Sequence, residues 1–222
     1  MSPTGVPQPN RGRLITLEGG EGAGKTTQQR RLAAHLEARG IETVLTREPG
    51  GTPGAEQIRA LVTGGAVDRW SAMTELLLMM AARSDHLDRV VRPALDAGRW
   101  VVSDRFHDSS RVYQGLAGGL GLEVVDRLHA PLLGSTLPDL TLLLDLDPRV
   151  GRERRRAQGG GGRFEDKHDD YHDRVRAGFL ALARAEPRRF AVVDAARAED
   201  EVAIDVIDAL RRLDPQPGRS AE

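Results

Sequence analysis

The chain has 222 residues, with 32 basic and 33 acidic side chains, a formal net charge of −1 and no cysteine. Because the two charge types balance and are interspersed, the composition excludes a polybasic surface for nucleic acid or a membrane. The lack of cysteine excludes a disulfide framework and thiol chemistry. A chain of this length suits one α/β domain with a core of its own.

The start of the chain, residues 1–11, is polar and proline-rich without an apolar targeting core, and no apolar run is long enough to span a membrane. We therefore expect a cytoplasmic protein that has neither a membrane nor a nucleic acid as a partner. We further expect a flexible tail over residues 1–12, one domain over residues 13–213 and a polar tail over residues 214–222.

The first predicted elements are a strand over residues 14–18 and a helix over residues 27–39, whose Leu32, Ala33 and Leu36 share one face. The segment between them matches the phosphate-binding pattern GxxxxGK(S/T) at every fixed position. The segment and the residue after it are Gly19, Gly20, Glu21, Gly22, Ala23, Gly24, Lys25, Thr26 and Thr27. Strand, loop and helix thus follow one another in the order that this motif requires.

This glycine loop predicts a nucleotide-phosphate site. Glycines let successive backbone amides converge on phosphate oxygens, and the N-terminus of the following helix favours negative charge. Lys25 supplies a mobile cation, and the hydroxyl of Thr26 is offered to Mg²⁺.

Further strands and helices alternate along the rest of the chain. We expect a strand at 42–46, a proline- and glycine-rich loop at 47–54, a helix at 71–97 that bends near Pro93, strands at 100–103, 140–145 and 190–193, and helices at 171–185 and 199–213. Such alternation is typical of a parallel sheet that is covered on both faces and binds ligands at the carboxyl ends of its strands. The predicted fold class is therefore α/β, a three-layer P-loop α/β/α fold with a parallel five-stranded sheet.

A mobile lid is expected at about residues 151–170. It carries an arginine cluster, namely Arg152, Arg154, Arg155, Arg156 and Arg163, and the glycine run 159–162 would provide hinge freedom. His168 and His172 are spaced to face one metal ion from a helix, but no third ligand with fitting spacing accompanies them. We therefore predict no metal site of this type in the lid.

Several separate segments together resemble thymidylate kinases over roughly residues 13–210. They are LEGGEGAGKT at 17–26, TREPGGTP at 46–53, LLLMMAAR at 76–83, SDRFHDSSRVYQG at 103–115, PDLTLLLDLDP at 138–148 and RFEDKHDDYHDRVRAGFLALA at 163–183. The resemblance implies Mg²⁺-dependent transfer of the ATP γ-phosphoryl group to dTMP, and a homodimer. The glycine loop would then bind ATP.

The resemblance also implies roles for single residues. Thr26 and Asp104 would hold Mg²⁺, Arg47, Arg59 and Arg105 would contact the monophosphate, and Glu48 would lie near the 3′-hydroxyl. Arg83, Ser110 and Gln114 would read the thymine edge, Tyr113 would crowd the ribose 2′ position, and Ser109 would complete the substrate site. Met79 stands where most members have a phenylalanine that stacks on thymine, which puts base affinity or selectivity in question.

Some thymidylate kinases carry an arginine inside the glycine loop, whereas residues 20–23 of this chain have no basic side chain. The sequence resembles the bacterial variety in which lid arginines supply that cation. Arg154 is the first candidate and Arg163 the second, and both join Lys25, Asp104 and Arg105 as predicted catalytic residues. One well-placed arginine of this kind is worth on the order of a thousandfold in rate.

Two other functions share the glycine loop. A kinase for another monophosphate, such as dUMP or CMP, would differ at the base edge. A nucleotide-dependent switch would read guanine with (N/T)KxD, and the nearest segment here, Asp166-Lys167-His168-Asp169, begins with aspartate and does not follow a strand.

Overall fold

The computed structural model describes residues 11–157, 159, 163–164 and 167–213. Both predicted tails, except for residues 11 and 12, and most of the predicted glycine hinge lie outside these residues. One sheet of five parallel strands has the order β2-β3-β1-β4-β5. The strands are β1 (Leu14–Glu18), β2 (Thr43–Arg47), β3 (Trp100–Asp104), β4 (Leu140–Asp145) and β5 (Phe190–Asp194). This sheet confirms the predicted parallel five-stranded α/β fold.

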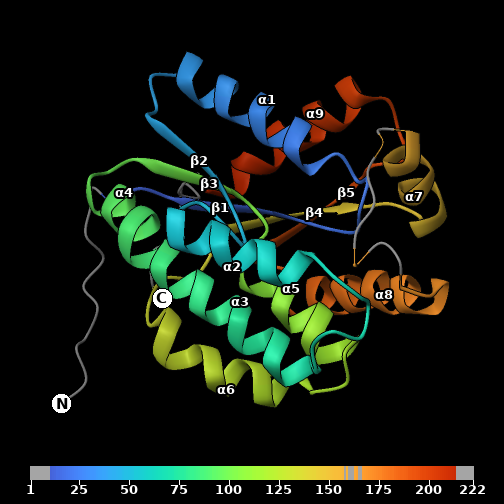
Figure 1. Cartoon of the computed structure of the whole chain (residues 1–222). Coiled ribbons are helices and arrows are strands. Elements are labelled where there is room, and N and C mark those ends of the chain that lie inside the picture. The colour runs from blue at the N-terminus through green and yellow to red at the C-terminus, as the bar shows by residue number, and fades with distance from the viewer. Residues whose placement is uncertain (1–10, 158, 160–162, 165–166, 214–222) are drawn as a thin grey trace, which may run out of the picture.

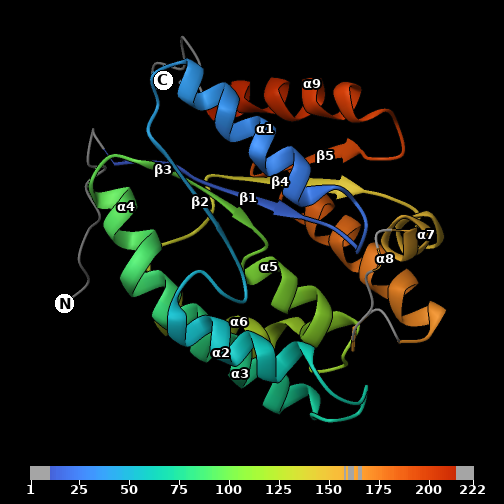
Figure 2. The same ribbon diagram turned by 45° about the horizontal axis from the view of Figure 1, so that its top comes forward.

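Helices cover both faces of the sheet (Figures 1 and 2). One face carries α1 (Lys25–Ala38) and α9 (Glu199–Ala209), which continues as the 3-10 turn Leu210–Leu213. The other face carries α3 (Ala72–His86), α6 (Leu122–Leu133) and α8 (Asp169–Ala185). No helix in the described part of the chain has both the length and the apolar character needed to cross a membrane.

The register of the sheet gathers polar side chains at one edge. Leu17 in β1 lies opposite Asp104 in β3, and Asp104 in turn lies opposite Arg47 in β2. Strand β1 is central and completely buried, and it ends at Glu18. Since all strands are parallel, Glu18, Arg47 and Asp104 meet where the strands end.

The helix predicted over residues 71–97 is interrupted. It runs as α3, then a π-helical turn from Leu87 to Val91, then α4 (Arg92–Asp96). Pro93 is the second residue of α4 and has no N–H to donate to the preceding π-helical turn. The sequence predicts a bend near Pro93. The structure has a π-helical turn directly before this residue, where the hydrogen-bond pattern of the helix changes.

Several helices were not predicted. They are α2 (Pro53–Thr63), α5 (His107–Ser110) with the π-helical turn Arg111–Leu116, α6, and α7 (Pro148–Ala157) at the start of the expected lid. Helix α2 begins inside the predicted irregular loop because Thr52 caps it, its hydroxyl accepting from the amide of Ala55 at 3.1 Å. Pro53 occupies the first helical position, where proline is favoured.

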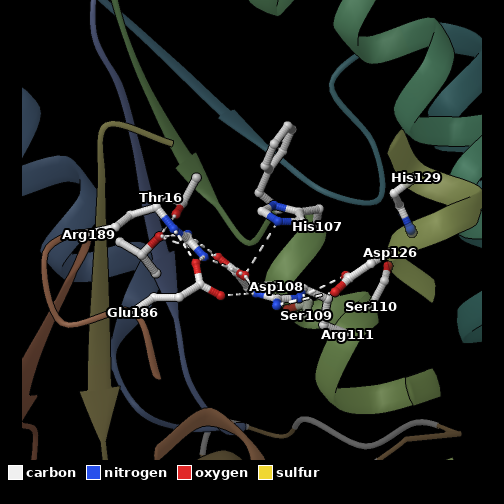
Figure 3. A network of polar contacts seen from close by, with 12 residues as sticks. Thr16, His107, Asp108, Ser109, Ser110, Arg111, Asp126, His129, Glu186 and Arg189 are labelled. Atoms are coloured by element: carbon white, nitrogen blue, oxygen red, sulfur yellow. Dashed lines mark hydrogen bonds and ion pairs between the residues drawn. The ribbon is translucent and has the colours of Figure 1, made fainter. Parts of the chain in front are cut away.

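A buried ionic network fixes α5 against the sheet (Figure 3). Asp108 is completely buried and pairs with Arg189, which precedes β5, at 2.6 Å and with Arg111 at 3.2 Å. Arg189 also donates to the hydroxyl of Thr141 in β4 at 2.7 Å. Burial raises the pKa of Asp108. The nearby His107 and the two arginines outweigh burial and hold this pKa far below its usual range. The segment after β3 is thus anchored to two other strands.

Candidate active site

A pocket of about 460 Å³ lies at the carboxyl ends of the strands, a volume typical of small-ligand sites. The predicted residues that line it are Glu21, Gly22, Ala23, Gly24, Lys25, Thr26, Thr27, Arg47, Glu48, Arg59, Met79, Arg83, Asp104, Arg105, Ser109, Ser110, Tyr113 and Gln114. They come from the glycine loop, β2, α2, α3 and the segment after β3. The structure therefore brings most of the predicted site together.

The glycine loop has the backbone that the motif requires. Gly22 and Gly24 have φ values of 69° and 86°, and Gly24 directly precedes the first residue of α1. A Cβ on Gly22 would lie 2.0 Å from the carbonyl oxygen of Gly151 in α7. This position accepts only glycine, both for its left-handed backbone and for its close contact with α7.

Lys25 folds back over the loop. Its Nζ donates to the carbonyl oxygens of Gly20 at 2.7 Å and Gly19 at 3.3 Å. Burial and the nearby Arg105 lower the pKa of Lys25, while Glu21 and Asp104 raise it. Gly19 and Gly20 thus contribute carbonyl groups that hold the lysine, and do not themselves line the pocket.

Thr26 and Asp104 form an oxygen-rich pair across the pocket floor. The Thr26 hydroxyl donates to Oδ2 of Asp104 at 2.8 Å, joining the first turn of α1 to the end of β3. A hydroxyl and a carboxylate are donor types that Mg²⁺ accepts, so the pair fits this ion. Among the described residues no group of three His, Cys, Asp or Glu side chains is placed to hold a metal ion.

Arg105 is the centre of the polar contacts around the loop. Its guanidinium donates to Gly19 O at 3.0 Å, Ser109 Oγ at 3.1 Å, Glu21 Oε1 at 2.6 Å and the Tyr113 hydroxyl at 3.2 Å. Burial raises the pKa of Glu21, but Arg105 and Lys25 outweigh it and hold that pKa at about 2. Arg105 also has a φ of 70°, unusual for a residue other than glycine.

Two further guanidinium groups line the pocket beside Arg105. Arg59 donates to the carbonyl oxygen of Pro49 at 2.8 Å, and Arg47 pairs with Glu56 at 3.0 Å. Burial lowers the pKa of Arg59, and so does repulsion from Arg47 and Arg105, whereas Glu56 raises it. Repelling cations at a pocket wall indicate a site for a polyanion, separate from the glycine loop.

The opposite wall is a buried hydrogen-bond network around Arg83. Its Nε donates to Glu48 at 2.7 Å, and its Nη1 donates to Ser110 at 3.1 Å and to His129. Burial and Arg83 lower the pKa of His129 to about 4, so the imidazole is neutral and accepts from the guanidinium. Glu48 also pairs with His86 at 2.9 Å. These contacts fix the position of Arg83.

The two lid arginines predicted to act on phosphate do not line the pocket. Arg154 donates to the carbonyl oxygen of Ala195 at 3.0 Å, and Arg163 is buried in an ion pair with Glu75 at 2.5 Å. Arg155 does line it, and its charge lowers the pKa of Glu21.

The phase of α7 explains which arginine faces the loop. Gly151 packs so closely on the loop that a Cβ there would lie 2.2 Å from the carbonyl oxygen of Glu21. A residue four positions later lies on the same face of a helix. This contact therefore turns Arg155, and not Arg154, toward the loop.

Five other lining residues were not placed at the site from the sequence. They are Pro49, Thr63, Phe106, Arg155 and Phe164. Arg155 was predicted only as a member of the lid cluster. Phe164 stands edge-on to Tyr113, with ring centroids 5.9 Å apart, and so extends the aromatic part of the wall. Pro49, Phe106 and Phe164 lie inside segments that carry the family resemblance, and this was a usable signal. Nothing in the local sequence marks Thr63.

Comparisons with known proteins agree on one family. The family model described as thymidylate kinase matches residues 17–206. The chain is 52% identical to a thymidylate kinase of Caulobacter vibrioides, with 90% of this chain and 96% of that protein covered, and 54% identical to one of Ruegeria pomeroyi, with 89% and 93% covered. It also resembles the crystal structure of thymidylate kinase from Ehrlichia chaffeensis, with a TM-score of 0.74, 31% identity and coverage of 90% of this chain and 99% of that one.

Buried Glu18 gives the site a pH-dependent stability. It accepts from the amides of Phe106 and Ser109 and from the Ser109 hydroxyl. Burial and the nearby Asp108 raise its pKa from 4.5 to about 7. The folded state therefore holds this proton more tightly than the unfolded chain, so the free energy of unfolding decreases as pH rises from about 4.5 to about 7.

We predict that Glu18→Gln removes this pH dependence. In urea unfolding, the stability of the wild type relative to the variant should fall by on the order of 3 kcal/mol between pH 4.5 and pH 8. Ser109→Ala, which keeps the carboxyl group, should retain the dependence. A constant difference between wild type and Glu18→Gln across this range would contradict the prediction.

Proposed function

The chain belongs to the thymidylate kinase family, and on that premise we propose that it transfers the γ-phosphoryl group of ATP to dTMP, giving ADP and dTDP for dTTP synthesis. The observation that carries the proposal is one pocket in which a glycine loop and a separate arginine group, Arg47, Arg59 and Arg105, stand together. Such a pocket suits two polyanions at once, as a donor and an acceptor that are both phosphorylated require.

The reaction requires no general base, because the nucleophile is already an anionic phosphate oxygen. Catalysis then consists of aligning two polyanions and neutralising their repulsion in line. In the proposed mechanism, the loop amides and Lys25 hold the β- and γ-phosphates of ATP. Arg105, Arg59 and Arg47 hold the phosphate of dTMP, with Arg105 bridging toward the loop through Gly19 and Glu21.

We propose that Thr26 and Asp104 hold Mg²⁺, which their oxygen atoms fit. When bound, the ion would neutralise charge between the β- and γ-phosphates.

Tyr113 and the Arg83 network would define the nucleoside side of the pocket. The buried Tyr113 ring lies beside Arg105, with the guanidinium carbon 5.1 Å from the ring centroid. This position supports a role in excluding a 2′-hydroxyl, and with it a preference for deoxyribose. Arg83, Ser110 and Gln114 would read the base edge, with Met79 packing on the thymine ring.

We propose Arg155 as the lid arginine that faces the transferring phosphoryl group. Its place at the pocket wall and its effect on Glu21 support this role. The lid has a second task, because water competes with dTMP as acceptor, and closure over both substrates would prevent ATP hydrolysis.

We also propose a homodimer through α2, α3 and α6. Leu61 on α2 is 44% exposed, and Met73 and Leu77, one turn apart on α3, are 37% and 50% exposed. Val124 on α6 adds a fourth exposed apolar side chain. The burial of these side chains against a second copy would remove apolar surface from water.

An acceptor panel tests the proposed activity. With ATP and Mg²⁺, ADP release should be fast with dTMP, slower with dUMP, dCMP, dGMP or AMP, and negligible without an acceptor. Lys25→Ala and chelation of Mg²⁺ should each abolish it. Preference for another monophosphate would support the related kinase, and slow guanine-dependent hydrolysis would support the switch.

The lid assignment predicts different results for neighbouring arginines. Arg155→Ala should lower kcat by about a hundredfold or more with a smaller change in the KM for dTMP, because the lost contact forms in the transition state. Arg154→Ala is the matched control and should lower kcat much less. A larger loss of kcat in Arg154→Ala than in Arg155→Ala would contradict the role of Arg155 and support Arg154.

The dimer proposal predicts a mass of two chains in light scattering after gel filtration. Leu77→Lys should shift the protein toward the mass of one chain, because it places a charge in the proposed interface. Ile204→Lys on α9, where the native side chain is 60% exposed on the other face of the sheet, should not. A mass of one chain for the wild type at micromolar concentration would contradict the dimer proposal.

A further inference from the structure

The pocket wall contains a glutamine whose amide orientation is fixed from behind. Gln114 lines the pocket and is 1% exposed, and its Nε2 donates to Oε1 of Glu75 at 2.7 Å. Glu75 lies in the first turn of α3 and is 3% exposed. A carboxylate only accepts hydrogen bonds, so it takes the amide nitrogen of Gln114 and not its carbonyl oxygen.

Arg163 holds Glu75 in this role. Its Nη1 lies 2.5 Å from Oε2 of Glu75, so the two carboxylate oxygens are divided between Arg163 and Gln114. Arg163 also donates to the backbone oxygens of Val62 and Ala66, both at 3.1 Å. Because the guanidinium is anchored and permanently charged, the carboxylate has a fixed position and a strong partner.

With its nitrogen engaged, Gln114 has its carbonyl oxygen left to offer to the pocket as an acceptor. Arg83, which lines the same pocket, has a donor left to offer. Of its five N–H groups, four donate to Glu48, Ser110, His129 and the backbone oxygen of Phe106. The remaining one, on Nη2, has no partner among the described residues. The wall therefore presents one acceptor and one donor.

We propose that Glu75 is a positioning residue that sets base specificity through the amide of Gln114. This inference rests on the proposed function, because it assumes that the base lies against Gln114. An acceptor beside a donor complements N3–H and O4 of thymine or uracil. It opposes cytosine, which has an unprotonated N3 and an amino group at C4.

A substitution of Glu75 by a side chain of the same size that carries a hydrogen-bond donor should reverse the orientation of the Gln114 amide. In Glu75→Gln, Arg163 still requires an acceptor and takes the new carbonyl oxygen. The new amide nitrogen then donates toward Gln114 and favours its carbonyl oxygen, which turns the Gln114 nitrogen into the pocket. A donor in that place suits N3 of cytosine and opposes N3–H of thymine.

The experiment measures kcat/KM for dTMP, dUMP and dCMP with the wild type, Glu75→Gln and Glu75→Asp. In Glu75→Gln the dTMP/dCMP ratio should fall by about tenfold or more. The dTMP/dUMP ratio should stay as in the wild type, because these bases share the N3–H and O4 edge. Glu75→Asp, which keeps a carboxylate, should retain most of the wild-type dTMP/dCMP ratio.

A merely structural role would lower all three activities together, so an unchanged dTMP/dCMP ratio in folded Glu75→Gln overturns the inference. Should that variant not fold, Glu75→Met provides the second test, since it removes the acceptor that holds the Gln114 amide nitrogen. A lower dTMP/dCMP ratio there supports the inference, and an unchanged ratio overturns it. A wild type that does not phosphorylate dTMP would instead refute the proposed function.

Discussion

The site depends on the confinement of positive charge around one phosphate pocket. Lys25 is buried and Arg59 and Arg105 are half-buried. Burial and the neighbouring guanidinium groups lower the pKa of Lys25 and of Arg59. Carboxylates interleaved between them, Glu21 above all, make this arrangement tolerable in the folded protein. The cations are thus kept apart at defined positions, where phosphate groups complete the neutralisation.

Two features of the fold produce this arrangement, namely the parallel sheet and the anchoring of α5. Parallel strands bring their carboxyl ends to one edge, so residues distant in sequence such as Glu18 and Asp104 become neighbours. The buried pair of Asp108 and Arg189 then fixes α5, whose Ser109 connects Glu18 to Arg105. The arginine that contacts the glycine loop is therefore positioned both by the loop and by the segment after β3.

The sequence was sufficient for the sheet and the loop because their signals are local. Short apolar runs define the strands, and GxxxxGK(S/T) defines the loop. Helix α2 was hidden in a segment rich in proline and glycine, where the Thr52 cap and Pro53 were the available signal. The choice between Arg154 and Arg155 could not be made locally, because it depends on Gly151 packing against the loop. The role of Glu75 likewise depends on contacts with two distant residues.

Glu21 shows how a loop without a basic side chain still assembles cations. Lys25 from the loop, Arg105 from the segment after β3 and Arg155 from α7 all lower its pKa. One acid thus draws positive groups from three segments to the place where an arginine inside the loop would otherwise stand. Because α7 follows β4 and precedes the glycine run, the cation it contributes belongs to a separate element from the loop. In the proposed enzyme, the positive charge beside the transferring phosphoryl group would therefore depend on the position of α7. Closure of the lid would in this way be coupled to catalysis.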